Sequence, residues 1–399
     1  MPLERLVYLD HAATTPLDSR VLEAMTPFLT TSYGNPSATY ALGKTSADAV
    51  AKARKTVASI IGCKPTEIIF TGAGTESINT AIKGVAFQQK KARAGNHIVT
   101  SQIEHHAVLH ACQYLERFGF EVTYLPVDGH GLVEPDDVAR AITPQTVLVS
   151  VMTANNEIGT IEPVFEIAAA VRERAAALRK RIAFHTDAVQ APNTLRMDFA
   201  ERGVDLLSLS AHKFRGPKGV GIMYIRRGVP FLAQQNGGGQ ERQRRAGTEN
   251  VAGIVGTAEA LRMTQESLEA DSARIRSLAT TLRDGILSAI SRTQINGDPS
   301  HRLANNVSIS FDGADSRDLV ADLDAAGVMV SAGAACNATT IEPSHVLIAC
   351  GVPLEQAAST LRFSLGPDTT ADDIDYVLST VPSIVERSRA KHAAGVAAG

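Results

Sequence analysis

The sequence predicts an α/β fold in which a mostly parallel central sheet carries helices on both faces and a smaller α+β domain follows. Short apolar runs alternate with stretches of helical periodicity up to about residue 262. Hydrophobic residues make up 44% of the chain, aromatic residues 5%, and Trp is absent, so the core must be aliphatic and rich in Ala. Such a core suits helices packed on a parallel sheet.

The first part of the chain reads as a series of strands joined by helices. Strands are expected at 67–71, 96–101, 120–125, 146–152, 182–187, 205–210 and 221–225. Helical stretches begin near Thr75 and His105, and others cover about 135–142 and 163–178. This alternation favours right-handed βαβ units and a parallel sheet.

The character of the sequence changes after residue 262. A long amphipathic helix is expected there, because Ile275, Leu278, Leu282, Ile286 and Ile290 recur at helical spacing. Further elements of this part are strands at 306–311 and 360–365 and helices at about 316–326 and 371–388. We therefore predict a second, α+β unit.

These patterns divide the chain into two domains. The large domain is expected at 15–262, and the small domain at 1–14 and 263–390. The segment 391–399 lacks periodicity and is expected to fray.

Composition excludes several classes of function. The net charge is -3, from 39 basic and 42 acidic residues, which gives no electrostatic reason to bind nucleic acid or an anionic membrane. No apolar run approaches the ~18 residues of a membrane span, and the first ten residues lack the apolar region of a signal peptide. The four cysteines, at 63, 112, 336 and 350, show no paired spacing, so we expect reduced thiols and a cytoplasmic protein.

Polar residues follow the predicted strands where these end. In an open parallel sheet, ligands bind beyond the carboxyl ends of the strands. The residues delivered there are Gly74 and Thr75, then His105, then Asn155 and Asn156, then Asp187 and Gln190, and last Ser210, His212 and Lys213. Small residues and a hydroxyl that open a helix form an anion site, although an ordinary helix cap has the same appearance.

One molecule requires this whole set of groups. Lys213 at the end of a buried strand is costly unless something reacts with it, and a buried Asp187 needs a cation or hydrogen-bond donors. Pyridoxal 5'-phosphate has a phosphate, a flat ring, a pyridine nitrogen that a carboxylate keeps protonated, and an aldehyde that takes up a lysine. A nicotinamide dinucleotide is disfavoured, because the turn GAGTES (72–77) lacks the full G-x-G-x-x-G pattern.

A metal site is not expected. His106 and His110 stand four residues apart on a predicted helix, but no third ligand follows at a useful spacing.

Longer segments around these residues carry a family resemblance. They are YLDHAATTP (8–16), GNPSATY (34–40), TGAGTESIN (71–79), EHHAV (104–108), NNEIGTIEP (155–163), HTDAVQ (185–190), SAHKFRGPKGVG (210–221), RRAGTEN (244–250), ACNATTIEPSHVL (335–347) and LRFSLG (361–366). In unbroken order from residue 8 to about 380, they resemble the cysteine desulfurases. Within this family they are similar to the branch that serves nitrogenase and iron–sulfur assembly, which is class V aminotransferase-like.

The resemblance implies a homodimeric pyridoxal phosphate enzyme of fold type I. It implies that Lys213 is the Schiff-base lysine, that Asp187 binds the pyridine nitrogen, and that His105 stacks on the ring and takes part in catalysis. The remaining implied cofactor residues are Gly74, Thr75, Ser210 and His212 at the phosphate, Gln190 at the phenolic oxygen, Asn156, and Thr248 from the other subunit. Asn156 and Arg362 are implied to hold the carboxylate of the substrate.

The implied reaction converts L-cysteine to L-alanine and leaves a persulfide on Cys336. The sulfur then passes to an acceptor, an iron–sulfur scaffold protein or another sulfur-acceptor protein. The loop around this cysteine departs from the family pattern S-x-G-S-A-C-T, since Ala334 and Asn337 replace two hydroxyl residues. This departure bears on loop mobility and acceptor preference.

Other interpretations remain open at this point. A selenocysteine lyase, or a direct cysteine or cystine C–S lyase, would keep the same cofactor residues and would not depend on Cys336. A non-catalytic sulfur carrier or cluster scaffold would not need Lys213 and Asp187 together. Free cysteines are most often small buried apolar residues, and Arg362 could be an ordinary surface charge.

Overall fold

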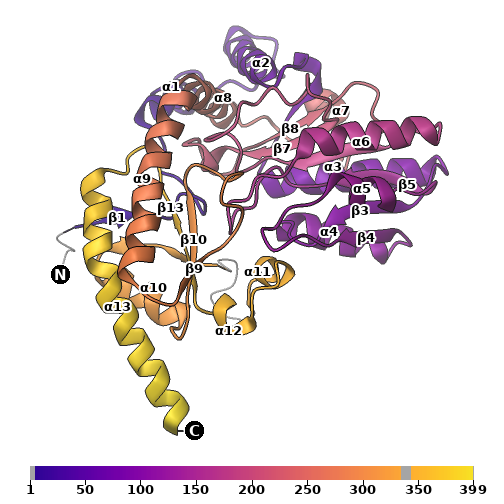
Figure 1. Ribbon diagram of the computed structural model, residues 1–399. Coiled ribbons are helices and arrows are strands. Elements are labelled where there is room, and N and C mark those ends of the chain that lie inside the picture. Colours follow the sequence, from indigo (N-terminus) through magenta and orange to yellow (C-terminus); the bar gives the residue numbers. More distant parts are fainter. Residues whose placement is uncertain (1–4, 334–342, 399) are drawn as a thin grey trace.

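The computed structural model describes residues 5–333 and 343–398 of the chain. Two units lie side by side in it, a large sheet flanked by helices and a smaller group of strands and helices (Figure 1). The first strand, β1 (Val7–Tyr8), and the last helix, α13 (Ala371–Ala398), both belong to the smaller unit. No helix in the described ranges is long and apolar enough to cross a membrane.

The large unit is built on a seven-stranded sheet in the order β2-β8-β7-β6-β5-β3-β4. Its strands are β2 (Ile68–Thr71), β3 (His97–Ser101), β4 (Glu121–Leu125), β5 (Thr146–Ser150), β6 (Ala183–Asp187), β7 (Leu206–Ser210) and β8 (Gly221–Ile225). All neighbouring pairs are parallel except those of β8, which runs antiparallel to both β2 and β7. The expected α/β class with a mostly parallel sheet is confirmed.

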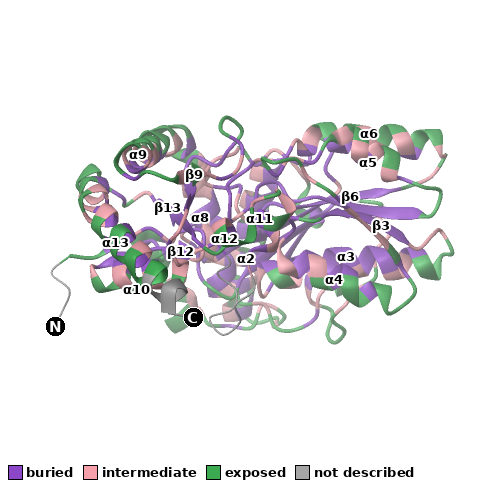
Figure 2. Cartoon of the chain, turned by 60° about the horizontal axis from the view of Figure 1, so that its bottom comes forward, coloured by how far each residue is buried: buried purple, intermediate pink, exposed green. Residues whose placement is uncertain are grey.

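Helices cover both faces of this sheet (Figure 2). They are α1 (Ser19–Thr30), α2 (Ala41–Ile61), α3 (Gly74–Lys91), α4 (His106–Glu116), α5 (Pro135–Ala141), α6 (Val164–Ala177), α7 (Gln240–Gln243) and α8 (Val251–Glu266), with 3₁₀ turns η1 (Pro65–Glu67) and η2 (Ala211–Lys213). Consecutive strand residues enter different apolar clusters, Ile98 with α3 and α4, and Val99 with α2, α6 and α8. Strand β3 is therefore buried on both faces, as a strand between two layers of helices must be.

The small unit has its own antiparallel sheet in the order β12-β13-β10-β9. Its elements are α9 (Leu268–Ala289), β9 (Thr293–Ile295), β10 (Asn306–Phe311), α10 (Ser316–Ala325), β11 (Val328–Met329), β12 (Ser331–Ala332), α11 (His345–Ala349), α12 (Leu354–Ala357), β13 (Thr360–Ser364) and α13 (Ala371–Ala398). The N-terminal strand β1 (Val7–Tyr8) pairs with β11, so Val7 and Leu9 share an apolar cluster with Leu282 and Phe363. The exact domain boundaries at residues 14 and 262 stay predictions.

One expectation about the C-terminus is wrong. The segment 391–399 was expected to fray, but helix α13 continues to Ala398. Alanine has the highest intrinsic helix propensity, so an Ala-rich end extends a helix without an apolar period. The absence of a helical spacing of apolar residues in this segment indicates only that the helix end has no regular apolar face to bury.

The core of the small unit yields a stability prediction. Leu282 on α9 is fully buried, so Leu282→Ala should lower the free energy of unfolding by about 2–5 kcal/mol through lost burial and a cavity. Urea unfolding followed by circular dichroism measures this change. Leu22→Ala on α1, where the side chain is 48% exposed, is the control and should change it by less than about 0.5 kcal/mol. Equal effects of the two substitutions would contradict the assignment of the core.

Candidate active site

Neighbouring strands bring polar residues to one edge of the large sheet. β6 ends at Asp187 and β7 at Ser210, and these two strands are parallel neighbours. β3 leads to His105, the residue before helix α4, whose Nδ1 accepts a hydrogen bond from the Ala107 amide at 3.1 Å. The carboxyl ends of parallel strands thus place Asp187, Ser210 and His105 at one edge.

Lys213 does not turn away to bulk solvent. It ends the 3₁₀ turn η2 directly after β7 and is half-buried. Its Nζ donates hydrogen bonds to the carbonyl oxygens of Ala12 at 2.7 Å and Ala13 at 2.6 Å. Gln190 Nε2 donates to the same Ala12 oxygen at 3.1 Å, so Gln190 and Lys213 meet at one acceptor.

His212 is held by the same N-terminal segment. Its Nδ1 lies 3.1 Å from Thr14 Oγ1, and its carbonyl oxygen accepts a hydrogen bond from Thr15 Oγ1 at 2.8 Å. Burial, and next the charge of Lys213, lowers the pKa of His212 to about 4. The imidazole is therefore neutral at pH 7 and keeps one nitrogen as a donor.

Burial shifts the two other titratable residues of this edge in opposite directions. It raises the pKa of Asp187 to about 6, against the lowering effects of the Val189 amide, which donates to Asp187 Oδ1 at 3.0 Å, and of Lys213. Burial and then Lys213 lower the pKa of His105 to about 4. At pH 7 the edge therefore presents an ionised carboxylate and a neutral imidazole.

The start of α3 lies against the end of β7. A Cβ added to Gly74 would stand 3.0 Å from Ser210 Cβ and 3.1 Å from Val189 Cγ2, so a side chain here would force a neighbour to shift by a few tenths of an ångström. The helix begins there without a side-chain cap, and Thr75 in its first turn is exposed. Uncapped amides at a helix N-terminus favour an anion.

Arg362 reaches the edge from the small unit. It is only 2% exposed on strand β13; its Nη1 donates to the Asn156 carbonyl at 3.0 Å, and its Nη2 lies 2.7 Å from Asp10 Oδ1. Its Nε is buried and has no hydrogen-bond partner among the described residues. It is therefore no surface charge, and a buried donor of this kind points to a further acceptor.

The described part of the structure does not place two of the predicted site residues, Thr248 and Cys336, at this edge of the sheet. Thr248 is exposed in the segment before α8, and its expected role depends on a second subunit. Cys336 lies outside the described residues. The other three cysteines suit packing roles, since burial raises the pKa of Cys63 and Cys350 to about 12 and that of Cys112 further.

The structure adds residues that sequence reasoning gave no role. Asp10 lies in the segment YLDHAATTP (8–16), and its carboxylate contacts Arg362 in the structure. The sequence alone does not show this partner, because the two residues are far apart along the chain. Glu104 precedes His105 and is fully buried, with Oε1 accepting hydrogen bonds from Ser101 Oγ at 2.7 Å and the Met152 amide at 2.8 Å. Glu157 accepts a hydrogen bond from Ser344 Oγ at 2.5 Å.

The histidines of α4 form a stack. The ring centroids of His106 and His110 lie 5.0 Å apart, and those of His106 and His345 lie 4.7 Å apart. In the ranges 5–333 and 343–398, no group of three His, Cys, Asp or Glu side chains is placed to hold a metal ion.

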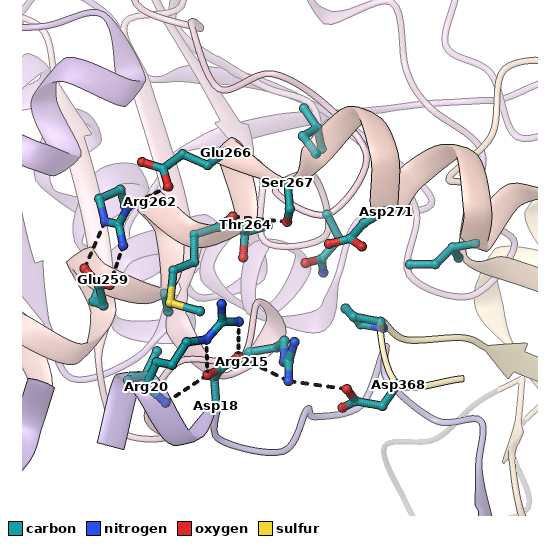
Figure 3. A pocket seen from close by; sticks show the side chains of 17 residues that line it. Asp18, Arg20, Arg215, Glu259, Arg262, Thr264, Glu266, Ser267, Asp271 and Asp368 are labelled. Carbon is teal, nitrogen blue, oxygen red and sulfur yellow. Dashed lines mark hydrogen bonds and ion pairs between the residues drawn. The ribbon is translucent and has the colours of Figure 1, made fainter. Parts of the chain in front are cut away.

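A cavity of about 500 Å³ is lined by Asn193 and Arg215 among others, and none of the predicted site residues lines it. Its arginines are matched to carboxylates (Figure 3). Arg20 and Arg215 contact Asp18, and Arg262 contacts Glu259 and Glu266. We interpret it as a crevice lined by ion pairs, separate from the edge that carries Lys213.

Comparisons with known proteins show the family of the chain. A family model described as Aminotransferase class-V matches residues 7–377. The chain is 49% identical over 385 residues to the cysteine desulfurase IscS of Methanosarcina thermophila, which is 96% of this chain and 93% of the relative.

Solved structures give the same result. A NifS-like protein is 38% identical, with a TM-score of 0.90, over 96% of this chain and 100% of that one. SspA in complex with cysteine is 35% identical, with a TM-score of 0.79, over 91% of this chain and 100% of that one. The resemblance found in the sequence and the expected fold class are confirmed.

Glu104 yields a prediction on the pH dependence of stability. Burial raises its pKa to about 8, above the value of an unfolded glutamate, so the folded protein binds this proton more tightly. Its contribution to stability is present below the unfolded pKa and is lost as the pH rises toward 8, by at most about 1.4 kcal/mol per pH unit. Glu104→Gln lacks this titration, so its free energy of unfolding relative to the wild type should rise between pH 5 and pH 8.

Urea unfolding at a series of pH values measures this difference. Glu116→Gln, which changes an exposed carboxylate on α4, is the control and should leave the pH dependence unchanged. A constant difference between Glu104→Gln and the wild type from pH 5 to pH 8 would show that Glu104 titrates normally.

Proposed function

Because the chain belongs to the aminotransferase class-V family and, within it, to the cysteine desulfurases, we propose that it binds pyridoxal 5'-phosphate and converts L-cysteine to L-alanine. The observation that carries this proposal is Lys213, an amine held at the carboxyl edge of the sheet by two carbonyl groups. A lysine in this position, beside the buried carboxylate Asp187, suits a cofactor with an aldehyde and a basic ring nitrogen.

The residues of the edge fit this cofactor. The approach of Gly74 to Ser210 leaves little room for a side chain at the uncapped start of α3, which supports a phosphate site completed by Thr75 and His212. Asp187, ionised at pH 7, would hold a proton on the ring nitrogen. His105 would lie on the face of the ring, and Gln190 would donate to its phenolic oxygen.

When bound, the cofactor stores the electron pair that is left when the Cα proton of the substrate is removed. The chain's own residues bind the substrate and move its protons. Nζ of Lys213, once free, would take the Cα proton, since a neutral amine is a base. In the neutral ring of His105, Nδ1 accepts from the Ala107 amide, so Nε2 carries the proton and would donate a hydrogen bond at the substrate.

Cys336 would receive the sulfur. Its thiolate attacks the substrate sulfur, an S–S bond forms, and the C–S bond of the substrate breaks. The carbon takes up a proton, so L-cysteine and the thiol become L-alanine and a persulfide. This role is inferred from the sequence segment around Cys336 in the family.

The proposed partners are a second copy of the chain and a protein that accepts the sulfur. A homodimer would bring Thr248 of one subunit to the phosphate site of the other, which suits its exposed position. The persulfide would pass to an acceptor protein, an iron–sulfur scaffold or another sulfur acceptor.

A single experiment tests the proposed reaction. Alanine and sulfide are measured together from L-cysteine with the wild type and with Cys336→Ala, under limiting reductant. We expect alanine from the wild type and a loss of at least about 100-fold in the variant, because the acceptor thiol is missing. Cys350→Ala, which changes a thiol whose pKa is raised to about 12, is the matched control and should retain activity.

The same assay separates the alternatives. Equal turnover by the wild type and Cys336→Ala would mean direct C–S lyase chemistry. Assays with L-selenocysteine then identify a selenocysteine lyase, which would process it without Cys336.

The attachment of the cofactor gives a second prediction. After reduction with borohydride, mass spectrometry should find the cofactor on the peptide that contains Lys213, because only an imine is fixed in this way. Lys213→Ala should lose this label, whereas Lys218→Ala, which changes an exposed lysine of the same loop, should keep it. A label that persists in Lys213→Ala would overturn the assignment.

A further inference from the structure

Arg362 is paired with a carboxylate of its own chain in the structure. Its Nη2 lies 2.7 Å from Asp10 Oδ1, and its Nη1 donates to the Asn156 carbonyl at 3.0 Å. A buried guanidinium needs an opposite charge, since removing one partner of a buried pair leaves an uncompensated charge. Asp10 supplies that charge in the structure.

The two partners differ in their freedom to move. The side chain of Arg362 is 2% exposed, whereas that of Asp10 is 20% exposed. The backbone of Asp10 is fixed by a bridge to Ser364, and its carbonyl oxygen accepts a hydrogen bond from Tyr8 Oη at 3.0 Å. If the pair separates, it is therefore the carboxylate of Asp10 that rotates toward solvent.

We propose that Asp10 is a positioning residue for Arg362, and that its carboxylate competes with the carboxylate of the substrate for the guanidinium. This inference rests on the proposed function, in which Arg362 binds that carboxylate. Before binding, Asp10 orients Arg362 and compensates its charge. A ligand carboxylate displaces Asp10, because two carboxylates on one guanidinium repel each other.

The competition makes Asp10 a determinant of ligand selectivity. An amine without a carboxylate has no group that displaces Asp10, and it leaves the pair intact. When an amino acid binds, part of its binding free energy is used to separate Asp10 from Arg362, so its affinity is lower than it would be without Asp10. Asp10 thus weakens the binding of the substrate and of the product L-alanine, and its carboxylate keeps the buried guanidinium neutralised between turnovers.

Asp10→Asn tests the competition, because asparagine keeps an oxygen that accepts from Arg362 and removes the charge. Dissociation constants are measured from the absorbance change of the bound cofactor with L-alanine and with ethylamine, which is L-alanine without its carboxylate. We expect the constant for L-alanine to fall about fivefold and that for ethylamine to stay unchanged. The KM for L-cysteine should fall in parallel.

Two further variants separate charge from positioning. Asp10→Ala removes the acceptor oxygen as well, so it should bind L-alanine more weakly than Asp10→Asn does. Asp312→Asn removes a carboxylate from an exposed pair with Arg292 in the same unit and should match the wild type.

An unchanged or higher constant for L-alanine in Asp10→Asn overturns the inference, and so does an equal change for ethylamine. If the variants do not fold, a crystal structure of the wild type with L-alanine decides. A contact between Asp10 and Arg362 longer than a hydrogen bond supports the inference, and an unchanged 2.7 Å contact overturns it. A wild type that binds neither cofactor nor L-alanine would overturn the proposed function itself.

Discussion

The position of Lys213 depends on two backbone carbonyl groups from the other end of the chain. A lysine amine can leave water only where other acceptors replace it, and Ala12 and Ala13 provide them. These carbonyls are themselves fixed by the small unit, because Leu9 belongs to its apolar cluster and the Ala12 amide donates to Ser364 Oγ at 2.9 Å. The lysine of the large unit is therefore held by the segment that follows strand β1, which is anchored on the small unit.

Burial then gives the residues around Lys213 different charges. The same loss of water raises the pKa of Asp187 and lowers the pKa values of His105 and His212. The lowered pKa values keep both imidazoles neutral at pH 7, whereas the rise for Asp187 stops at about 6, which still favours the carboxylate at pH 7. Because Lys213 lowers the pKa values of all three groups, its position also sets part of this pattern.

The sequence predicted which residues gather at the edge of the sheet better than it predicted the direction of each strand and the position of each helix. Asp187 and Ser210 could be placed together because the directions of strands in βαβ units are known, and the structure has both at strand ends. The reversed direction of β8 was missed, although the connection 211–220 is too short for a parallel crossover. Helix α8 was not predicted, because its glycines lower helix propensity. Its glycines serve close packing instead, since a Cβ on Gly256 would stand 2.5 Å from Met25 Sδ on α1.

The partners of Lys213 could not be predicted for a different reason. They are main-chain carbonyl groups, which leave no mark in the side-chain pattern of the segment 8–16. The role of Asp10 was hidden in the same way, because its partner Arg362 lies in a strand of the distant small unit. Side-chain chemistry at strand ends can be read from a sequence, but contacts between units depend on how two separate cores are joined.

The buried acids near the edge complete the electrostatic argument for Arg362. Burial raises the pKa of Glu157 to about 7 and that of Glu104 to about 8, so both carry less negative charge at neutral pH than a glutamate in water. An ionised Glu157 would attract Arg362, since the charge of Arg362 already lowers its pKa. Protonation of this acid reduces that competition, and the guanidinium is left mainly to Asp10 and to a ligand carboxylate. Burial of Glu157 therefore favours the binding of a ligand carboxylate at Arg362.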